Sequence, residues 1–468
     1  MADDTEQSRK CNWRKLTSSA WVLLASIVLL GSCIESLYAA DGEEDGQQEA
    51  AKDPDDSPFP LTMYDTGQDI RTRDTLTGNW SIRGSTRNEL AESGITPKLQ
   101  LTQILQAVTQ GGATSDEGLR YSGSADAYLD LDTTRLGLWS GGLWHFHAET
   151  WWGHSANPDA GSLMPVNHDA LFPVPEESGK TTLSEFSLTQ YFSPRAGVLI
   201  GKIDPVAIAD ANVFANNERT QFLNTALRNN PVLFPQAPYT TLAVAGFWQA
   251  TESLFISAFA LDGNGTATRS GLGNNGWFHR PKGTNVGSEL TLTVRPFGRS
   301  GHQRLGIAHS NKEFTNLTLD PRFDSSGVPG FATSSGDWIM WYNFDQYLYT
   351  DPQDENQGFG IFGRFGASNG KVNPTERFYS IGIGGQSFFP GRDLDRFGVG
   401  YYYFDISEDL SNAVGVDHDE QGAEVFYNAA LTPWITFSLD VQYIIHPAGG
   451  FEGRRDAVVV GTRIQMEF

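Results

Sequence analysis

The C-terminal residues 456–468 alternate between apolar and hydrophilic positions up to the end of the chain. One face carries Val458, Val460, Thr462, Ile464, Met466 and Phe468, and the other carries Gly461, Arg463, Gln465 and Glu467. A period of two residues indicates a β-strand with one apolar face. A last strand that ends in an aromatic residue is typical of outer-membrane barrels, in which it pairs with the first strand and leaves no free edge. We therefore predict that Phe468 is an assembly signal for a barrel.

Composition favours one large barrel over two or three soluble domains. The 468 residues include 50 Gly, 29 Phe, 15 Tyr and 12 Trp, yet only 39% of the chain is hydrophobic. A barrel spreads its apolar residues over one outer face and fills the inner face with polar ones, whereas a large soluble core needs more of them. The net charge of −23 repels nucleic acid, so we predict no nucleic-acid partner.

The N-terminal part is typical of an exported protein. Basic residues precede an apolar run at 20–30, and the small residues Ala39 and Ala40 follow, so residues 1–40 are predicted to be a signal peptide. An alternative is that Leu30-Gly31-Ser32-Cys33, which resembles a lipoprotein box, leaves a lipidated Cys33. Residues 41–72 are acidic and poor in apolar residues, which predicts a disordered linker. Its role does not follow from the sequence. Both cysteines precede residue 41, so we expect no disulfide in the exported chain.

Residues 73–468 are predicted to form the barrel. A short helix is expected at about 79–95, with Gly94 as its stop. Alternating segments follow at 121–131, 144–152, 185–188, 289–294 and 435–443. No later stretch approaches the roughly 18 apolar residues of a membrane-spanning helix. At about ten residues per strand, the chain fits about 16 strands, so the predicted fold is an all-β, transmembrane antiparallel barrel with both termini on the periplasmic side.

Aromatic residues near the expected strand ends predict belts at the two membrane interfaces. The residues concerned are Trp151, Trp152, Trp338, Trp341, Tyr401, Tyr402, Tyr403 and Trp434. Alternation alone does not exclude a soluble sandwich, in which the polar face meets bulk water.

Several short motifs, taken in order, resemble the carbohydrate-selective outer-membrane porins of the OprB type. They are Leu76-Thr77-Gly78-Asn79-Trp80 with Arg83, Leu90 and Gly94-Ile95; Asp130-Leu131-Asp132 before Leu136-Gly137-Leu138-Trp139; Gly201-Lys202-Ile203-Asp204-Pro205; Phe214-Ala215-Asn216 with Gln221-Phe222-Leu223-Asn224; Phe389-Pro390-Gly391-Arg392-Asp393; and Thr432-Pro433-Trp434 with Tyr443, Pro447 and Gly449-Gly450. The chain departs from the pattern at Ser81-Ile82, where the family commonly has two glycines, and in its long acidic leader. The resemblance implies a barrel of about 16 strands through which monosaccharides and related solutes diffuse across the outer membrane.

A channel for neutral sugars needs hydrogen-bonding groups in its lumen to replace hydration, and a constriction that forces contact. The candidate pore residues on strands are Asp126, Asp130, His145, His147, Glu149, Glu185, Lys202, Asp204, Arg364, Asp440 and Arg463. The long loop 211–238 is predicted to form the constriction, and its candidates are Asn216, Glu218, Arg219, Gln221 and Asn224. The alternatives are solvated wall residues in a wide channel and an extracellular loop folded on itself.

Catalysis has no positive signal, and the chain is predicted not to be an enzyme. No Gly-x-Ser-x-Gly elbow, phosphate-binding loop or cysteine nucleophile is present. His145 and His147 share a strand face with Glu149, a pattern that also suits a metal, but the same groups serve as hydrogen-bond partners in a lumen. We predict no metal and no cofactor.

The favoured function is a passive, sugar-preferring porin of the outer membrane, whose partners are monosaccharides, membrane lipid and the barrel-assembly machinery. The alternatives are a general, cation-leaning porin, suggested by the acidic balance, and a secreted all-β carbohydrate-binding protein without a pore. The preferred sugar and the choice between monomer and trimer stay open at this point.

Overall fold

The computed structural model describes residues 85–113, 118–171, 181–263, 283–323, 329–352, 354–450 and 453–468. The predicted signal peptide at 1–40, the linker at 41–72, Cys33 and the motif residues at 76–83 lie outside these ranges.

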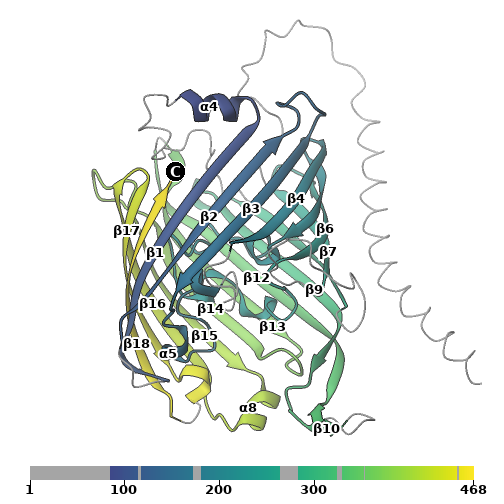
Figure 1. Cartoon of the computed structure of the whole chain (residues 1–468), viewed down its shortest axis with the longest axis vertical. Helices are drawn as coiled ribbons and strands as arrows, with labels where there is room; N and C mark the ends of the chain where they lie inside the picture. Colours follow the sequence, from purple (N-terminus) through teal and green to yellow (C-terminus); the bar gives the residue numbers. More distant parts are fainter. Residues whose placement is uncertain are drawn as a thin grey trace, which may run out of the picture.

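Sixteen of the described strands close into an antiparallel barrel in which each strand pairs with its neighbours along the chain (Figure 1). They are β1 (Ile95–Gly112), β2 (Arg120–Asp132), β3 (Gly142–Gly153), β4 (Thr181–Ser193), β5 (Ala196–Ile203), β6 (Thr241–Gln249), β7 (Leu254–Asp262), β8 (Thr284–Val294), β9 (Gly301–Thr315), β12 (Thr333–Asp351), β13 (Asp354–Ser368), β14 (Thr375–Gln386), β15 (Arg396–Ile406), β16 (Glu420–Thr432), β17 (Ile435–Ile445) and β18 (Arg455–Glu467). Strands β10 (Pro321–Phe323) and β11 (Pro329–Phe331) form a separate hairpin. The predicted fold class and strand number are confirmed.

The last strand closes the barrel against the first, as its sequence pattern predicts. Strand β18 pairs with β1 in a register that sets Met466 opposite Leu101. Beyond the strand, the Phe468 amide donates to the Leu99 carbonyl at 2.8 Å, so the terminal aromatic residue belongs to the closing ladder. Since every strand then has two neighbours, the barrel has no open edge to expose to lipid.

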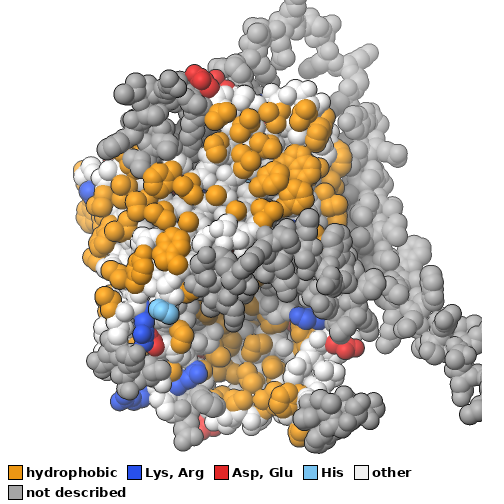
Figure 2. Space-filling view, in the orientation of Figure 1, with side chains coloured by type: hydrophobic (Ala, Val, Ile, Leu, Met, Phe, Trp, Pro, Cys, Tyr) orange, Lys and Arg blue, Asp and Glu red, His pale blue; other side chains and the backbone are white. Residues whose placement is uncertain are grey.

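Alternation along β18 separates the two faces of the wall. Val460 and Ile464 are 41% and 37% exposed on the outer face, whereas Arg463 and Gln465 are buried on the inner face. Figure 2 shows hydrophobic side chains spread over the outer surface of the barrel, with charged side chains near its ends. This is the distribution that a lipid-facing wall requires. None of the helices in the described part of the chain is long and apolar enough to cross a membrane.

The predicted aromatic belts are partly wrong. Trp338 and Tyr401 are exposed on the outer wall, but Trp151, Trp341 and Tyr402 are buried inside the barrel. The physical reason is the two-residue period itself, because residues 401 and 402, or 338 and 341, must point to opposite faces.

The helices are short, and most lie in the loops. They are α4 (Ser85–Glu92), α5 (Asn157–Ala160), α6 (Pro205–Ile208), α7 (Thr225–Arg228) and α8 (Glu408–Val414), with single 3-10 turns η2 (Asp169–Leu171), η4 (Pro231–Leu233), η5 (Pro296–Gly298) and η6 (Pro447–Gly450). Helix α4 falls within the predicted range 79–95, but Ile95 already begins β1. Gly94 adopts φ of +93°, which only glycine adopts without strain, and ends the helix as predicted.

The two ends of the barrel differ in the length of their connections. Helix α4 and the C-terminus lie at the same end (Figure 1), where the turns are as short as residues 194–195 and 433–434. The opposite end carries the long connections, including residues 204–240 between β5 and β6. Two of these long connections turn into the barrel and build the site described next.

Candidate functional site: the constriction of the barrel

The connection between β5 and β6, residues 204–240, is here called the inner loop because its residues bond side chains of the inner wall. Its turns are defined locally by their first residues. Asp204, Asn224 and Asn230 each accept a hydrogen bond from the backbone amide two residues ahead, and proline follows Asp204 and Asn230. Side-chain caps and proline at the first helical position are the usual start signals of helical turns. The chain therefore folds into α6, α7 and η4 instead of an open coil.

One buried ion pair fixes the middle of the inner loop to the wall. The Arg364 Nε of β13 donates to the Asp210 carboxylate at 2.7 Å, and both side chains are fully buried. The remaining nitrogens of Arg364 donate to the Leu227 and Ala215 carbonyls at 2.8 and 2.6 Å. A single guanidinium thus joins three points of the loop. Its fork of donors in fixed geometry suits that task.

The far side of the loop is held by strands from the end of the chain. The Glu424 carboxylate of β16 accepts from the Leu223 and Asn224 amides at 2.6 and 2.8 Å. Arg463 of β18 donates to the Glu218 carbonyl and, at 2.9 Å, to the Gln221 carbonyl. These contacts compensate buried backbone groups that would otherwise lack partners.

The apolar side of the inner loop packs on a glycine-rich part of the inner wall. Phe214, Phe222, Leu227 and Val232 are buried in one cluster with wall residues such as Phe362 and Phe426. A side chain at Gly400 would place its Cβ 2.8 Å from Leu227, and one at Gly360 would place it 2.7 Å from Phe214. Glycine at these positions lets the loop lie directly on the backbone of β13 and β15. The loop therefore fills one side of the lumen.

A second segment, residues 154–171 between β3 and β4, also turns inward and contacts the inner loop. The Glu420 carboxylate accepts from the Leu163 amide at 2.7 Å and holds this segment to β16. The Thr225 amide donates to the Pro165 carbonyl at 2.9 Å, and the His168 amide donates to the Leu223 carbonyl at 2.9 Å. The two segments thus form one body that narrows the lumen.

The inner loop faces β2–β5 with a charged edge. Arg219 Nη2 lies 2.8 Å from the Asp126 carboxylate of β2, and Nη1 lies 2.9 Å from Glu218. Arg219 Nε is also 4.0 Å from Asp169 of the second segment, and Arg228 pairs with Glu218. The Arg219–Asp126 contact therefore joins the charged edge of the loop directly to β2 of the wall.

The wall opposite this edge carries a histidine between two carboxylates. His147 Nε2 lies 2.9 Å from Asp126, and Nδ1 lies 3.1 Å from Glu185. Its ring stacks on Tyr128 with centroids 4.2 Å apart. The Asp204 amide of the inner loop donates to Glu185 at 3.0 Å, so Glu185 bonds both the wall and the loop.

Lys202 and Glu149 complete this group. Ser184 donates to Glu149, and the Lys202 ammonium interacts electrostatically with Glu149 and Glu185. Lys202 is 2% exposed, and its Nζ has no hydrogen-bond partner within the described ranges. We call Asp126, His147, Glu149, Asp169, Glu185, Lys202, Glu218, Arg219 and Arg228 the charged cluster.

Burial and nearby guanidinium groups shift the pKa values of the loop carboxyl groups in opposite directions. Burial raises the pKa of Asp169 to about 7, and burial together with the nearby Glu185 carboxylate raises the pKa of Asp204 to about 7. Burial also acts to raise the pKa of Glu218, but the guanidinium groups of Arg228 and Arg219 outweigh it and hold this pKa far below its usual range. The edge thus contains one firmly charged carboxylate and two that titrate near neutral pH.

The sequence-predicted residues separate into three groups. Asp126, His147, Glu149, Glu185, Lys202, Glu218 and Arg219 meet in the charged cluster, and Asp204 adjoins it. Asp130 and His145 pair with each other at 2.6 Å on the same wall. Arg364, Arg463, Asp440, Gln221, Asn224 and Asn216 lie where the inner loop is shaped and anchored: Gln221 accepts from the Asn216 amide, Asn224 donates to Gln442, and Gln442 donates to Asp440.

Sequence reasoning missed Tyr128, Asp169 and Asp210. Tyr128 falls on the hydrophilic face of the 121–131 alternation, which was the available signal. Asp169 lies in a connection without a recognisable motif, and nothing local marks Asp210 as the partner of Arg364. Both became visible only with the tertiary contacts.

A metal fits this site poorly. Asp126, His147 and Glu149 offer ligand atoms within 4.8 Å of one another. However, both His147 nitrogens already bond carboxylates, and Arg219 lies against Asp126. The suggested His145–His147 pair is not formed, since His145 bonds Asp130.

A closed 16-strand barrel with an apolar outer wall and a lumen narrowed by an inward loop defines a porin. Comparison with known proteins identifies the porin family. Residues 116–468 match the family model described as "Carbohydrate-selective porin, OprB family". The chain therefore belongs to the carbohydrate-selective porin, OprB family, whose members let sugars diffuse through an outer-membrane barrel.

The individual relatives have low sequence identity to this chain. The chain is 22% identical to Porin B of Pseudomonas aeruginosa over 423 residues, which cover 84% of this chain and 91% of that protein. It is 21% identical to Porin AaxA of Chlamydia trachomatis over 299 residues, or 64% of this chain and 57% of that one. Among solved structures, Pseudomonas putida OprB at high pH matches with a TM-score of 0.70 at 21% identity, covering 85% of this chain and 99% of that one.

Proposed function

We propose that monosaccharides and related small solutes cross this porin past the charged cluster, where the charged edge of the inner loop meets the wall formed by β2–β5. The observation that carries the proposal is the asymmetric docking of the loop. Its apolar side is sealed onto the glycine-rich wall, so its charged edge borders the remaining path. Passage is passive and involves no chemical step.

The charged cluster supplies what a neutral sugar loses on entering a narrow pore. Carboxylates accept hydrogen bonds from hydroxyl groups, while guanidinium and ammonium groups donate to hydroxyl oxygens. Lys202 is suited to the second role because its buried Nζ lacks a hydrogen-bond partner among the described residues. Binding stays weak, because each group exchanges an existing partner or water for the solute, and weak binding permits flux.

A second candidate, a general cation-leaning pore, is favoured by the charge balance of the cluster. Five carboxyl groups (Asp126, Glu149, Asp169, Glu185 and Glu218) face three cationic side chains (Lys202, Arg219 and Arg228), with His147 between two of the carboxyl groups. An excess of one sign in a low-dielectric constriction favours ions of the other sign.

Planar-bilayer recording separates the two candidates. The purified porin is expected to show conductance steps, and added glucose is expected to reduce the ion current in a saturable way as it occupies the constriction. A current that glucose does not change would favour the general pore, and an absence of conductance steps would contradict both candidates.

Ion selectivity is expected to change with pH. The carboxyl groups of Asp169 and Asp204 both have a pKa of about 7, so each loses its proton and becomes negative as the pH rises through neutrality. The K⁺ to Cl⁻ permeability ratio, measured from reversal potentials, should therefore be larger at about pH 8.5 than at about pH 5.5. Replacing both residues with asparagine should flatten this difference. An unchanged pH dependence in the double variant would show that these groups do not face the path.

Deletion of Phe468 is expected to reduce insertion into the outer membrane while leaving export intact. The deletion removes the terminal aromatic residue and its hydrogen bond to the Leu99 carbonyl at the seam. The measurement is the heat-modifiable fraction in outer-membrane and periplasmic samples. Phe468→Tyr, which keeps an aromatic ring, is the matched control.

We further propose export through a signal peptide at 1–40, lipid contact over the outer wall, and recognition of the C-terminal strand by the barrel-assembly machinery.

A further inference from the structure

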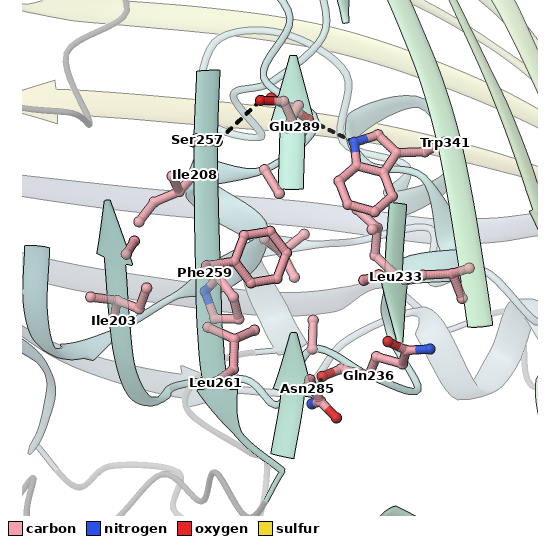
Figure 3. A pocket seen from close by; sticks show the side chains of 17 residues that line it. Ile203, Ile208, Leu233, Gln236, Ser257, Phe259, Leu261, Asn285, Glu289 and Trp341 are labelled. Carbon is pink, nitrogen blue, oxygen red and sulfur yellow. Dashed lines mark hydrogen bonds between the residues drawn. The ribbon is translucent and has the colours of Figure 1, made fainter. Parts of the chain in front are cut away.

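An apolar pocket lies between the inner loop and the wall, on the side of the loop that faces β5–β9 and β12. Its cavity volume is about 60 Å³. The wall contributes Ile203, Ala245, Phe259, Leu261, Ala308 and Ile339, and the loop contributes Ile208 of α6 and Leu233 of η4. Figure 3 shows Phe259 in the middle of these side chains. The pocket is thus lined almost entirely by hydrocarbon.

Polar contacts at both ends of the pocket join the loop to the wall. At one end, Glu289 of β8 accepts from the Trp341 indole nitrogen at 2.6 Å and from the Asp210 amide of the loop at 3.1 Å. At the other end, the Asn285 side-chain amide donates to the Gln236 carbonyl of the loop. Figure 3 shows these two ends on opposite sides of the pocket. Small residues, Ala245 and Ala308, leave the wall recessed between them.

Along the chain, the pocket lining adjoins a residue that contacts the charged cluster. Its lining residues Ile203 and Pro205 stand on either side of Asp204 in the chain. The Asp204 amide bonds Glu185 of the charged cluster at 3.0 Å. A solute held at the cluster therefore lies next to the segment that forms one wall of the pocket.

The chemistry of the lining selects the group that fits. A sugar hydroxyl placed there would lose its hydrogen bonds to water, which costs free energy, whereas an alkyl group gains from leaving water. The volume sets the size. It is well below the roughly 150 Å³ of a cavity known to hold benzene, so only a group smaller than that ring fits. The pocket has room for a short alkyl chain of two or three carbons.

We propose that this pocket is a subsite for a short alkyl substituent on a sugar, so that the porin takes up short-chain alkyl glycosides with preference over the free sugar. The inference rests on the proposed sugar path and adds a second point of contact to it. The sugar ring stays at the charged cluster, and its alkyl group enters between α6 and the wall.

The test is an alkyl series measured by current block in planar bilayers. The probes are glucose and its methyl, ethyl, propyl and pentyl β-glucosides. Each methylene that enters the pocket should raise the association constant by up to about fourfold. The rise should continue through propyl and stop before pentyl, because the pocket is then full. Equal association constants for glucose and propyl glucoside would overturn the proposal.

Filling the pocket provides the matched variants. Ala308→Leu should remove the preference, measured as the ratio of the propyl glucoside constant to the glucose constant. Ala245→Val is a smaller filling that should halve or further reduce the same ratio if the leucine variant does not fold. Ala258→Leu lies on β7 next to the pocket-lining Ser257 and, by strand alternation, on the outer face, so it should leave the ratio unchanged.

The outcomes distinguish the subsite from the path itself. A ratio that stays high in a folded Ala308→Leu porin, confirmed by heat-modifiable migration, would place the alkyl group elsewhere and overturn the subsite. If glucose neither blocks the current nor permeates, the proposed function fails first. If glucose blocks and the alkyl series is flat, only the subsite fails.

Discussion

Replacing Arg364 with methionine is expected to release the inner loop and to raise single-channel conductance. The substitution removes one guanidinium that holds Asp210, Ala215 and Leu227 together, and it leaves the buried Asp210 carboxylate without its cation. Removing one partner of a buried ion pair typically costs about 3–5 kcal/mol. The free energy of unfolding, measured by denaturant titration in detergent micelles, should fall by an amount in this range.

A double variant separates the effect of loop release from the effect of losing a charge in the lumen. In the double variant Arg364→Met with Asp210→Asn, no uncompensated charge remains, so part of the lost stability should return while the conductance stays high. Arg377→Met is the matched control, because Arg377 is a surface arginine of β14 with a 56% exposed side chain paired to Asp405. If the conductance of Arg364→Met equals that of the unmodified porin, the inner loop does not limit the pore.

Replacing Arg219 with glutamine is expected to weaken sugar association about tenfold, equivalent to about 1.4 kcal/mol. Arg219 joins the charged edge of the inner loop directly to Asp126 of β2. A hydrogen bond to a charged group contributes about 1.5–3 kcal/mol, which is consistent with this loss. The measurement is the glucose concentration that halves the ion current.

Two further variants show whether the effect belongs to this position. Lys202→Met should reduce association similarly, because the proposal assigns its unpaired ammonium to the solute. Arg322→Gln, on the exposed β10 strand, should have no effect. If neither Arg219→Gln nor Lys202→Met alters block or current, both are wall residues that solutes do not contact.

Much of the barrel could be predicted because its signal is local. Alternation at residues 456–468 specifies which side chains face inward, and the same two-residue period correctly separates Trp144 and Phe146 from His145 and His147. The aromatic belts failed in part for the same reason. Residue type suggests a membrane interface, but the parity of the position decides which face the ring occupies.

The site was only partly predictable because its key contacts join distant parts of the chain. Arg364 and Arg463 were predicted to be pore residues. Both are buried inside the barrel, where they hold the inner loop through partners 154 and 245 residues away. The charge of a side chain and the strand face it occupies follow from the local sequence. Its bonding partner depends on the tertiary fold. Asp169 shows the limit: it joins the cluster only because the segment 154–171 turns into the barrel.

The docking of the inner loop also constrains the order in which the chain acquires its structure. The loop leaves β5 early in the sequence, but the wall on which it rests is built from β12–β18. Until those strands are in place, Phe214, Phe222 and Leu227 have no apolar surface to cover them, and such transiently exposed residues favour aggregation. The pore therefore narrows only as the cylinder closes. An unfinished barrel lacks both the β1–β18 pairing and the docked inner loop. The channel therefore reaches its narrow form only when the wall is complete.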